Sequence, residues 1–438
     1  MNLPIADAVD HTPLPEDSKE EWCSSILKPK SPRSRMTQIP RVPMILKQHT
    51  HNDKYYVLKV VSLGPYHHGK PNFELMEGFK PLYTHKLLKG NHEAIRILYD
   101  SLSQMVPTLR GYYEDDTYHL SDDEFTRMML LDGCFILYII EHIIFKDETG
   151  NTLGLKSHEI MFIQEDMFLL ENQIPYQVLT EVMKFVPYAY LDLKITRFID
   201  DYIFGAERCN KRSWTQVKNP LDPTTINHLL QLLQTMLTKE RSYGHFPNNN
   251  GYTFRNVTEL IEVGIHFKPN PTRSLADIKF SKCGFSASLE LPPITIDNST
   301  KPILLNLVAY EMCSNDITAS WVTTYICLMD SLIDHPEDVK VLRKAGILDN
   351  RIGSDEEVAQ LFNEIGRDLV PDKYVYFHAR QAIQKHYESK RNTWVSQLKH
   401  EYMKTPWAFV ALLVGVVGLF LSCVQTYFSV WGNQSRYG

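Results

Sequence analysis

The chain has 438 residues, of which 43% are hydrophobic and 22% are charged, and its formal net charge at pH 7 is −6. This composition is typical of a globular protein and excludes a disordered, collagenous or disulfide-scaffold chain. The net acidity argues against a nucleic-acid partner, for which a strongly basic domain is expected. The charge is uneven, because residues 373–404 carry seven basic and two acidic side chains, whereas residues 1–372 together carry −12.

The N-terminal part of the chain predicts a disordered arm over residues 1–38, rich in proline and charge, and then a globular body over residues 39–371. Ile39–Pro43 and Tyr55–Leu63 predict an extended entry segment, because proline and β-branched residues disfavour helix. Hydrophobic periodicity then predicts helices over 73–105, from a capping box at 121–124, and over 157–171, 175–185, 190–204 and 223–238.

The second half of the body begins with alternating apolar and polar residues at 264–268, 276–280 and 287–297. This period is that of half-buried strands, and we expect a small antiparallel sheet around 264–297. Helical patterns resume at Ile303 and include 319–333 and a helix opened by a second capping box at 354–357. The predicted fold class is therefore mainly α (α+β): a large helical body with a small antiparallel sheet, plus one C-terminal transmembrane helix.

The C-terminal region predicts a membrane anchor. Residues 372–404 predict a basic juxtamembrane helix, 405–431 a transmembrane helix and 432–438 a short tail. The thirty-one residues between Lys404 and Arg436 carry no charge, and about twenty apolar residues suffice to cross a bilayer. Trp407, Tyr427 and Trp431 are placed as interfacial aromatic anchors. The alternative is a helix buried in a protein core.

The charge pattern also predicts an orientation. The basic excess precedes the apolar segment, which by the positive-inside rule places the body in the cytosol. No secretory signal is evident at the N-terminus, so we expect a single-pass, tail-anchored protein of the plasma membrane or endoplasmic reticulum. Two glycosylation acceptor patterns, Asn256-Val-Thr258 and Asn298-Ser-Thr300, leave a lumenal body open as the alternative.

Small residues form a stripe along the apolar segment, at helical spacings of three and four. Its members are Ala408, Ala411, Gly415, Gly418 and Ser422. Small side chains let two membrane helices approach closely, so this stripe is a candidate surface for a homodimer or a partner helix. Small residues are common in membrane helices, and a chance arrangement is equally compatible with the pattern.

The side chains with the greatest chemical potential are His67 and His68, with Asp132, Glu171 and Glu311 elsewhere. Imidazole can bind metal or act as a base, but adjacent histidines diverge on most backbones. We therefore favour a structural turn over a metal site and predict no catalytic residue, metal ligand or cofactor, and identify no small-molecule substrate. The seven cysteines contain no Cys-x-x-Cys pair, so neither a zinc site nor a disulfide framework is expected.

Several segments, taken together and in order, resemble the signature stretches of a plant-specific family, the domain of unknown function 247. They are Ile39–Pro43, Val61–Gly69, Leu131–Leu137, Asp166–Pro175, Asn306–Glu311 and Pro406–Ala408. The resemblance implies a land-plant source, a largely helical body and a C-terminal membrane helix. No enzymatic activity is established for the family, and some members act as self-incompatibility determinants in grasses. The Tyr176-Gln177 pair departs from the family pattern, in which an aromatic pair is more typical.

Two functional hypotheses follow. In the first, the protein is a recognition or signalling component bound to the lipid bilayer that acts by contact with an unknown protein partner. Self-incompatibility is one form of such recognition. In the second, it is a membrane-bound, metal-dependent hydrolase centred on His67 and His68 together with Glu171. Histidine-dependent metal content would distinguish them.

Overall fold

The computed structural model describes residues 22–24, 26–27, 37–48, 52–114, 119–145, 154–186, 191–204, 225–238, 255–283, 286–314, 320–388 and 406–431. The chain divides into two compact units, Met1–Thr37 and Gln38–Gly438. Most of the predicted N-terminal arm lies outside the described residues, so that prediction stays open.

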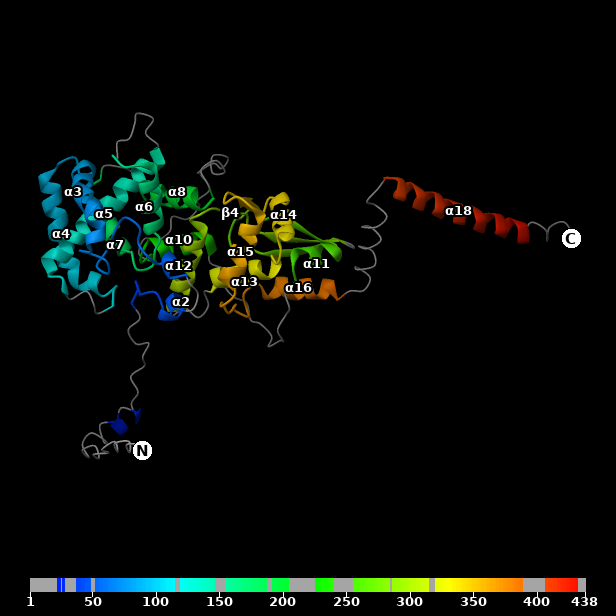
Figure 1. Cartoon of the computed structure of the whole chain (residues 1–438), viewed down its shortest axis with the longest axis horizontal. Helices are drawn as coiled ribbons and strands as arrows, with labels where there is room; N and C mark the ends of the chain where they lie inside the picture. The colour runs from blue at the N-terminus through cyan, green and yellow to red at the C-terminus, as the bar shows by residue number, and fades with distance from the viewer. Residues whose placement is uncertain are drawn as a thin grey trace, which may run out of the picture. The chain divides into compact units, whose positions relative to one another are not determined.

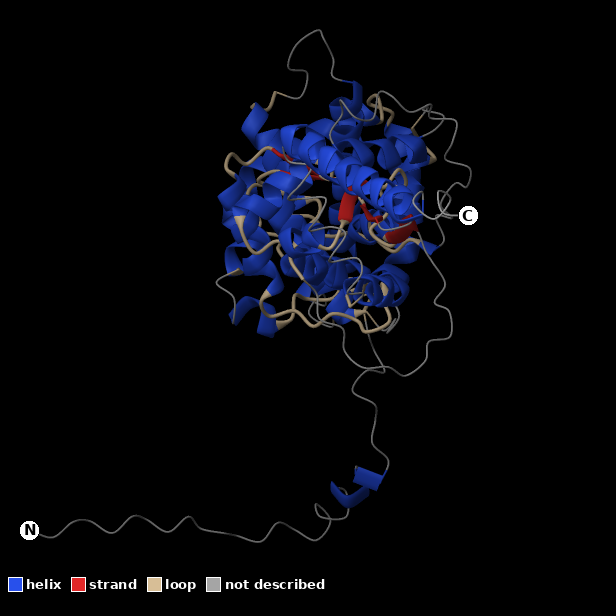
Figure 2. Cartoon of the chain, turned by 90° about the vertical axis from the view of Figure 1, so that its right-hand side faces the viewer, coloured by secondary structure: helices blue, strands red, loops and turns tan. Residues whose placement is uncertain are grey.

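The second unit is mainly helical, as predicted, with few strands among many helices (Figure 2). Its first half contains α2 (Met44–Gln48), the 3-10 turns η1 (Asp53–Tyr55) and η2 (Pro71–Phe73), α3 (Glu74–Leu87), α4 (His92–Arg110), α5 (Asp122–Phe145), α6 (Ser157–Asp166), α7 (Tyr176–Met183), α8 (Leu191–Phe204) and α10 (Leu229–Thr238).

The second half holds all the described strands. It contains α11 (Val257–Glu262), β1 (Ile265–Pro269), β2 (Lys279–Cys283), β3 (Ser286–Leu291), β4 (Ile294–Ile296), α12 (Thr300–Cys313), α13 (Trp321–Leu332), α14 (Pro336–Lys344), β5 (Leu348–Asn350), α15 (Asp355–Gly366), α16 (Phe377–Tyr387) and α18 (Pro406–Trp431). Helices α3–α7 gather on one side of α10 and α12, and α11, α13–α16 and the strands gather on the other (Figure 1).

Helix α5 is central to the first half of the body. Its predicted capping box is confirmed, because the Glu124 carboxylate accepts a hydrogen bond from Ser121 N–H at 2.9 Å and Ser121 Oγ accepts one from Glu124 N–H at 3.3 Å. Phe125, Phe135 and Ile139 are fully buried. Helices α3, α4, α7 and α8 all pack against α5, which explains why apolar residues cover most of its circumference.

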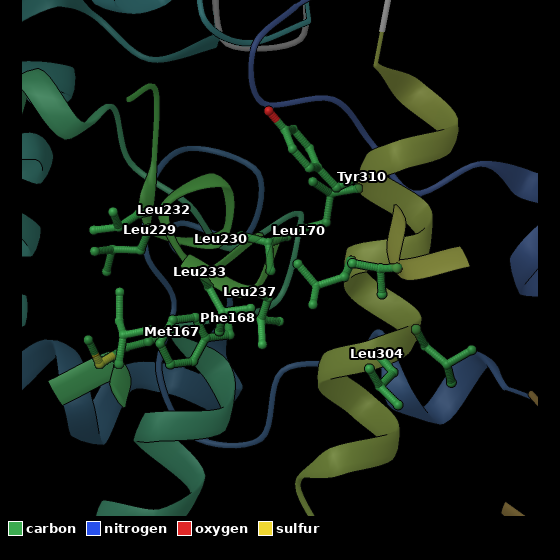
Figure 3. Packing of buried hydrophobic residues seen from close by; sticks show 14 of the residues in the cluster. Met167, Phe168, Leu170, Leu229, Leu230, Leu232, Leu233, Leu237, Leu304 and Tyr310 are labelled. Atoms are coloured by element: carbon green, nitrogen blue, oxygen red, sulfur yellow. The ribbon is translucent and has the colours of Figure 1, made fainter. Parts of the chain in front are cut away.

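The two halves share one core around α10 and α12. Figure 3 shows α10 between residues of the α6–α7 turn and α12, with Leu230 and Leu237 on the side of α12 and Leu229 and Leu232 on the other side. The labelled residues are Met167, Phe168, Leu170, Leu229, Leu230, Leu232, Leu233, Leu237, Leu304 and Tyr310. All of them belong to a single buried cluster that runs through both halves. The body is therefore one folded unit and not two independent domains.

The sheet differs from the prediction. The three-stranded sheet has the order β1-β3-β2, and β1 is parallel to β3 whereas β2 is antiparallel to it. A second, two-stranded sheet pairs β4 with β5 in parallel. A small sheet is thus present where it was predicted, with one antiparallel pair, but the prediction of an all-antiparallel sheet is wrong, because both sheets contain parallel pairing. Alternation identifies which residues form strands, but it carries no information on which strand pairs with which.

The predicted transmembrane helix is not confirmed. Residues Pro406–Trp431 do form the helix α18. Within the part of the chain that the structure describes, however, no helix meets the length and hydropathy needed to cross a membrane. Within the predicted juxtamembrane helix at 372–404, residues Phe377–Tyr387 form α16, and residues 389–405 lie outside the described residues, so its place beside a membrane stays a prediction.

The contact between α5 and α7 depends on a glycine. A Cβ atom at Gly133 would lie 3.0 Å from Val178 Cγ1 and 3.1 Å from Val182 Cγ2. Gly133→Leu should therefore lower the free energy of unfolding by about 1–3 kcal/mol, because overpacking displaces neighbours. Urea denaturation of the full chain measures this change.

The matched control is Gly78→Leu in α3, where an added Cβ atom would meet nothing within 4 Å. This exchange should raise the free energy of unfolding by about 0.5–1 kcal/mol, since leucine favours helix more than glycine does. Equal effects of the two substitutions would contradict the close packing of α5 on α7.

Candidate functional site

The polar residues of the motif stretches meet around an extended segment, Leu58–Gly69. Val61, Ser62, Leu63 and Gly64 are buried in it, yet the segment belongs to no helix or strand. Its buried N–H and C=O groups therefore need hydrogen-bond partners from elsewhere in the chain. We call this segment the buried strap.

The carboxylate of Asp166, at the end of α6, binds the beginning of the buried strap. It accepts hydrogen bonds from the N–H groups of Lys59, Val60 and Val61 at 2.9, 2.8 and 2.9 Å. Asp166 is fully buried, and this burial raises its pKa to about 6 despite the three N–H donors. The residue thus supplies acceptors that a neighbouring strand would otherwise provide.

Asn172 and Gln173 continue this arrangement in the α6–α7 turn. Asn172 Oδ1 accepts from Leu63 N–H at 2.7 Å, and its Nδ2 donates to Val61 O at 3.1 Å. Gln173 Nε2 donates to Met167 O at 2.8 Å, while its Oε1 accepts from Leu230 N–H at 3.1 Å. The two amides therefore tie the turn both to the buried strap and to α10.

A buried ion pair holds the middle of the strap. Lys80 Nζ lies 2.6 Å from Asp132 Oδ1, and both side chains are 1% exposed. Lys80 also donates to Ser62 O at 2.7 Å, and Asp132 Oδ2 accepts from Gly64 N–H at 2.8 Å. Burial alone would lower the pKa of Lys80, but Asp132 and Glu77 raise it above its ordinary value.

Gly64 adopts a left-handed backbone conformation with φ of +71°. A Cβ atom there would lie 2.7 Å from Gln173 O, so both the conformation and the contact require glycine. Next to it, the Tyr113 hydroxyl donates to the same carbonyl at 3.0 Å. The turn predicted around Gly64–Gly69 is thus packed directly on the α6–α7 turn.

The two histidines of this turn diverge, as expected of adjacent side chains. His67 Nε2 lies 3.5 Å from Glu171 Oε2, and His67 Nδ1 lies 2.7 Å from Lys70 Nζ. His68 instead acts electrostatically on Glu77 and Glu124. Across the described residues, no three His, Cys, Asp or Glu side chains are arranged to hold a metal ion.

Glu171 ties the strap region to the entry segment. Its Oε1 accepts from Val42 N–H at 2.9 Å and from Lys47 Nζ at 2.7 Å. Burial alone would raise its pKa, but the hydrogen bonds from His67, Lys47 and Val42 lower it to about 2. Glu171 is therefore an ionised structural acceptor at neutral pH, a state that does not suit a general acid.

The motif stretch on α12, Asn306–Glu311, also carries structural hydrogen bonds. Glu311 accepts from the N–H groups of Val322 and Thr323 at 2.9 and 2.8 Å, which satisfies the start of α13. Asn306 accepts from Leu170 N–H at 2.9 Å and donates to Tyr55 O at 3.1 Å. Burial raises the pKa of Glu311, and the hydrogen bonds partly offset that rise.

Of the predicted anchor residues, Tyr427 is 57% exposed on α18, and the side chains of Trp407 and Trp431 lie outside the described set. Of the small-residue stripe, Gly415 and Gly418 have open space around an added Cβ atom, and Ala411 and Ser422 are exposed. The Ala408 side chain is not among those described. The roles of these residues stay predictions.

Comparison with known proteins places this chain in a family. Residues 39–421 match the DUF247 family, described as "Plant protein of unknown function". The chain belongs to the DUF247 family. The predicted family resemblance is thereby confirmed. In this member Leu131–Leu137 and Asp166–Pro175 accept hydrogen bonds from the buried strap, which contains Val61–Gly69. The stretch Asn306–Glu311 instead binds the α6–α7 turn, Tyr55 and the start of α13.

Two curated relatives come from Arabidopsis thaliana. UPF0481 protein At3g47200 is 25% identical over 422 residues, covering 86% of this chain and 83% of the relative. Putative UPF0481 protein At3g02645 is 22% identical over 487 residues, covering 89% of each chain. No solved structure matches this DUF247 protein.

Sequence reasoning missed two central residues. Lys80 lies in α3 between positions that face the core, and a lone lysine in such a pattern is the available signal for a buried ion pair. Asp166 begins a recognised motif stretch, but nothing near it in sequence indicates that it binds the backbone more than 100 residues earlier.

The buried ion pair makes a quantitative prediction for this DUF247 protein. Lys80→Met should lower the free energy of unfolding by about 3–5 kcal/mol, because it leaves Asp132 buried without a counter-charge. The double variant Lys80→Met with Asp132→Asn should recover most of that loss. Lys344→Met, at an exposed position of α14, is the control and should change stability by less than about 0.5 kcal/mol. A small effect of Lys80→Met in urea denaturation would contradict the pairing.

Glu171 makes a prediction about pH. A carboxylate whose pKa is lowered on folding stabilises the folded state above its unfolded pKa, here the ordinary value of 4.5, and loses that contribution as the pH falls to about 2. Glu171→Gln should therefore reduce stability by about 1–3 kcal/mol at neutral pH and by progressively less below pH 4.5. Urea denaturation of both proteins across this range measures the difference. A difference that stays constant with pH would contradict the lowered pKa.

Proposed function

We propose that this DUF247 protein is a membrane-anchored recognition or signalling component that acts through protein–protein contacts. The observation that carries the proposal is α18, a helix of 26 residues without a charged side chain. Its Leu413, Val414, Leu419 and Phe420 are 50–70% exposed. Apolar surface of this extent needs a lipid or protein environment.

The charge distribution supports the same arrangement. The basic excess over residues 373–404 precedes α18, and each Lys or Arg near an anionic leaflet contributes about 1 kcal/mol of attraction. In this proposal the body lies in the cytosol, at the plasma membrane or endoplasmic reticulum. The residues that follow Trp431 lie on the opposite side of the bilayer.

The motif stretches favour a function through protein–protein contact over a catalytic function. Asp132, Asp166, Glu171 and Glu311 each accept hydrogen bonds from backbone N–H groups at 2.8–2.9 Å. Side chains that hold the fold in this way are poorly suited to exchange protons with a substrate. Self-incompatibility, which the family resemblance implies for some members, is one form such recognition could take.

Membrane anchoring is tested by alkaline carbonate extraction of cells that express the full chain. The protein should stay in the membrane pellet, and Val414→Arg with Val417→Arg should release it to the supernatant. Each arginine near the centre of a membrane helix costs about 2.5–3.5 kcal/mol, so two offset the gain of about 3–7 kcal/mol from the apolar residues. The control is Val370→Arg, at a valine of the body that is 83% exposed.

Retention of the double-arginine variant in the pellet would contradict anchoring by α18.

Proximity labelling with the same three proteins then tests recognition. A set of labelled proteins shared by the wild type and Val370→Arg, and lost in the double-arginine variant, is expected. Stoichiometric metal in the purified protein that is lost in His67→Ala and His68→Ala would instead favour the hydrolase.

A further inference from the structure

A cleft of about 370 Å³ lies where the two halves of the body meet. It is lined by the end of α5, by α6 and α8, by β4 and the turn that follows it, and by Arg351 just after β5. Its volume falls in the range of about 300–1,000 Å³ typical of small-molecule sites. None of the residues discussed around the buried strap lines it.

One wall of the cleft is apolar. Ile143, Ile144, Met161 and Phe198 line it, and Met161 is 44% exposed. The Phe198 ring is nearly parallel to the ring of Tyr202, at an interplanar angle of 9° and a centroid distance of 6.1 Å. Aliphatic side chains beside flat aromatic rings form a surface that suits an apolar ring of a ligand.

The charged side chains at the cleft already have partners in the protein. Asp201 Oδ2 lies 3.5 Å from Arg197 Nε, and Arg351 Nε lies 3.2 Å from Asp349 Oδ2. Asp297 Oδ1 accepts hydrogen bonds from the N–H and hydroxyl of Ser299 at 2.9 and 2.6 Å. A charged ligand would have to compete with these contacts, which disfavours it.

The uncharged polar groups at the cleft are different. The side-chain amides of Gln164 and Asn298 line it and form no hydrogen bond with any part of the chain that is described. The Thr295 residue is 6% exposed, and its buried hydroxyl has no hydrogen-bond partner among the described residues. A buried hydroxyl without a hydrogen-bond partner lowers the stability of the fold. Rotation about χ1 of Thr295 would exchange the positions of its hydroxyl and its methyl group.

We propose that this cleft binds an uncharged ring-shaped molecule that carries a hydroxyl group. The ring of the ligand packs on Ile144, Met161 and Phe198. The polar group bonds to the amides of Gln164 and Asn298. The proposal does not depend on α18, so anchoring and binding can fail separately.

The probe for this site is 4-(hydroxymethyl)benzophenone, an uncharged aromatic ketone that attaches to nearby C–H bonds on illumination. The purified full chain is labelled over a range of probe concentrations, and the labelled peptides are mapped by mass spectrometry. Labelling of the α5, α6 and α8 segments should saturate. Labelling of exposed segments of the body away from the cleft should rise linearly and serves as the internal reference.

The matched compound 4-ethylbenzophenone replaces the hydroxyl with a methyl group. The wild type should need about tenfold more of it for half-saturation, the ratio expected for one lost hydrogen bond. Gln164→Leu combined with Asn298→Ala should remove that preference and leave the saturation by 4-ethylbenzophenone unchanged. If saturable labelling by both compounds is lost, the double variant is misfolded. In that case the single variant Gln164→Leu, which keeps the shape of the side chain, is measured instead, and it should reduce the preference for the hydroxyl compound.

Filling the cleft provides an independent check. Ile144→Trp should abolish saturable labelling of α6 and α8, whereas Ile97→Trp, at a 45% exposed position of α4, should leave it intact. Linear labelling of α6 and α8 in the wild type would overturn the proposal. Equal saturation in the wild type and Ile144→Trp would overturn it as well.

Discussion

The structure depends on one constraint, the need to satisfy the backbone of a buried segment that is neither helix nor strand. The buried strap, Leu58–Gly69, lies against the α6–α7 turn and against α3 and α5. Asp166 and Asn172 accept from its first half, and Asp132 accepts from Gly64 N–H. Each unpaired buried backbone group would cost about 1–3 kcal/mol. Side chains from distant helices therefore supply the hydrogen bonds to the strap that a neighbouring strand supplies in a sheet.

This constraint bears directly on function. The motif stretches of this DUF247 protein contain acids, amides and histidines of the kind that enzymes use. In the folded chain they bind backbone groups, other helices or each other. Among the described residues, the exposed apolar side chains of α18 and the cleft beside α6 and α8 lie apart from these motifs. These two surfaces are the ones on which our proposals of recognition and of ligand binding rest.

Much of the fold could be predicted from local patterns. The helical body, the central position of α5 and the capping box at Ser121 follow from periodicity and from contacts between residues three or four apart. The strand order could not be predicted, because alternation does not identify partners. Pairing of Lys80 with Asp132 was equally inaccessible, since it joins residues far apart in the chain. The split of one predicted helix into α3 and α4 follows from the left-handed conformations of Lys89 and Gly90.

The central claim is that side-chain hydrogen bonds, and not secondary structure, hold the buried strap in place. Native-state hydrogen exchange of the strap amides tests it most directly. The N–H groups of Val61, Leu63 and Gly64 should exchange as slowly as those in the middle of α5, and Asn172→Ala should speed the exchange of Leu63 far more than that of α5. Rapid exchange of the strap amides in the wild type, beside slow exchange in α5, would contradict the account.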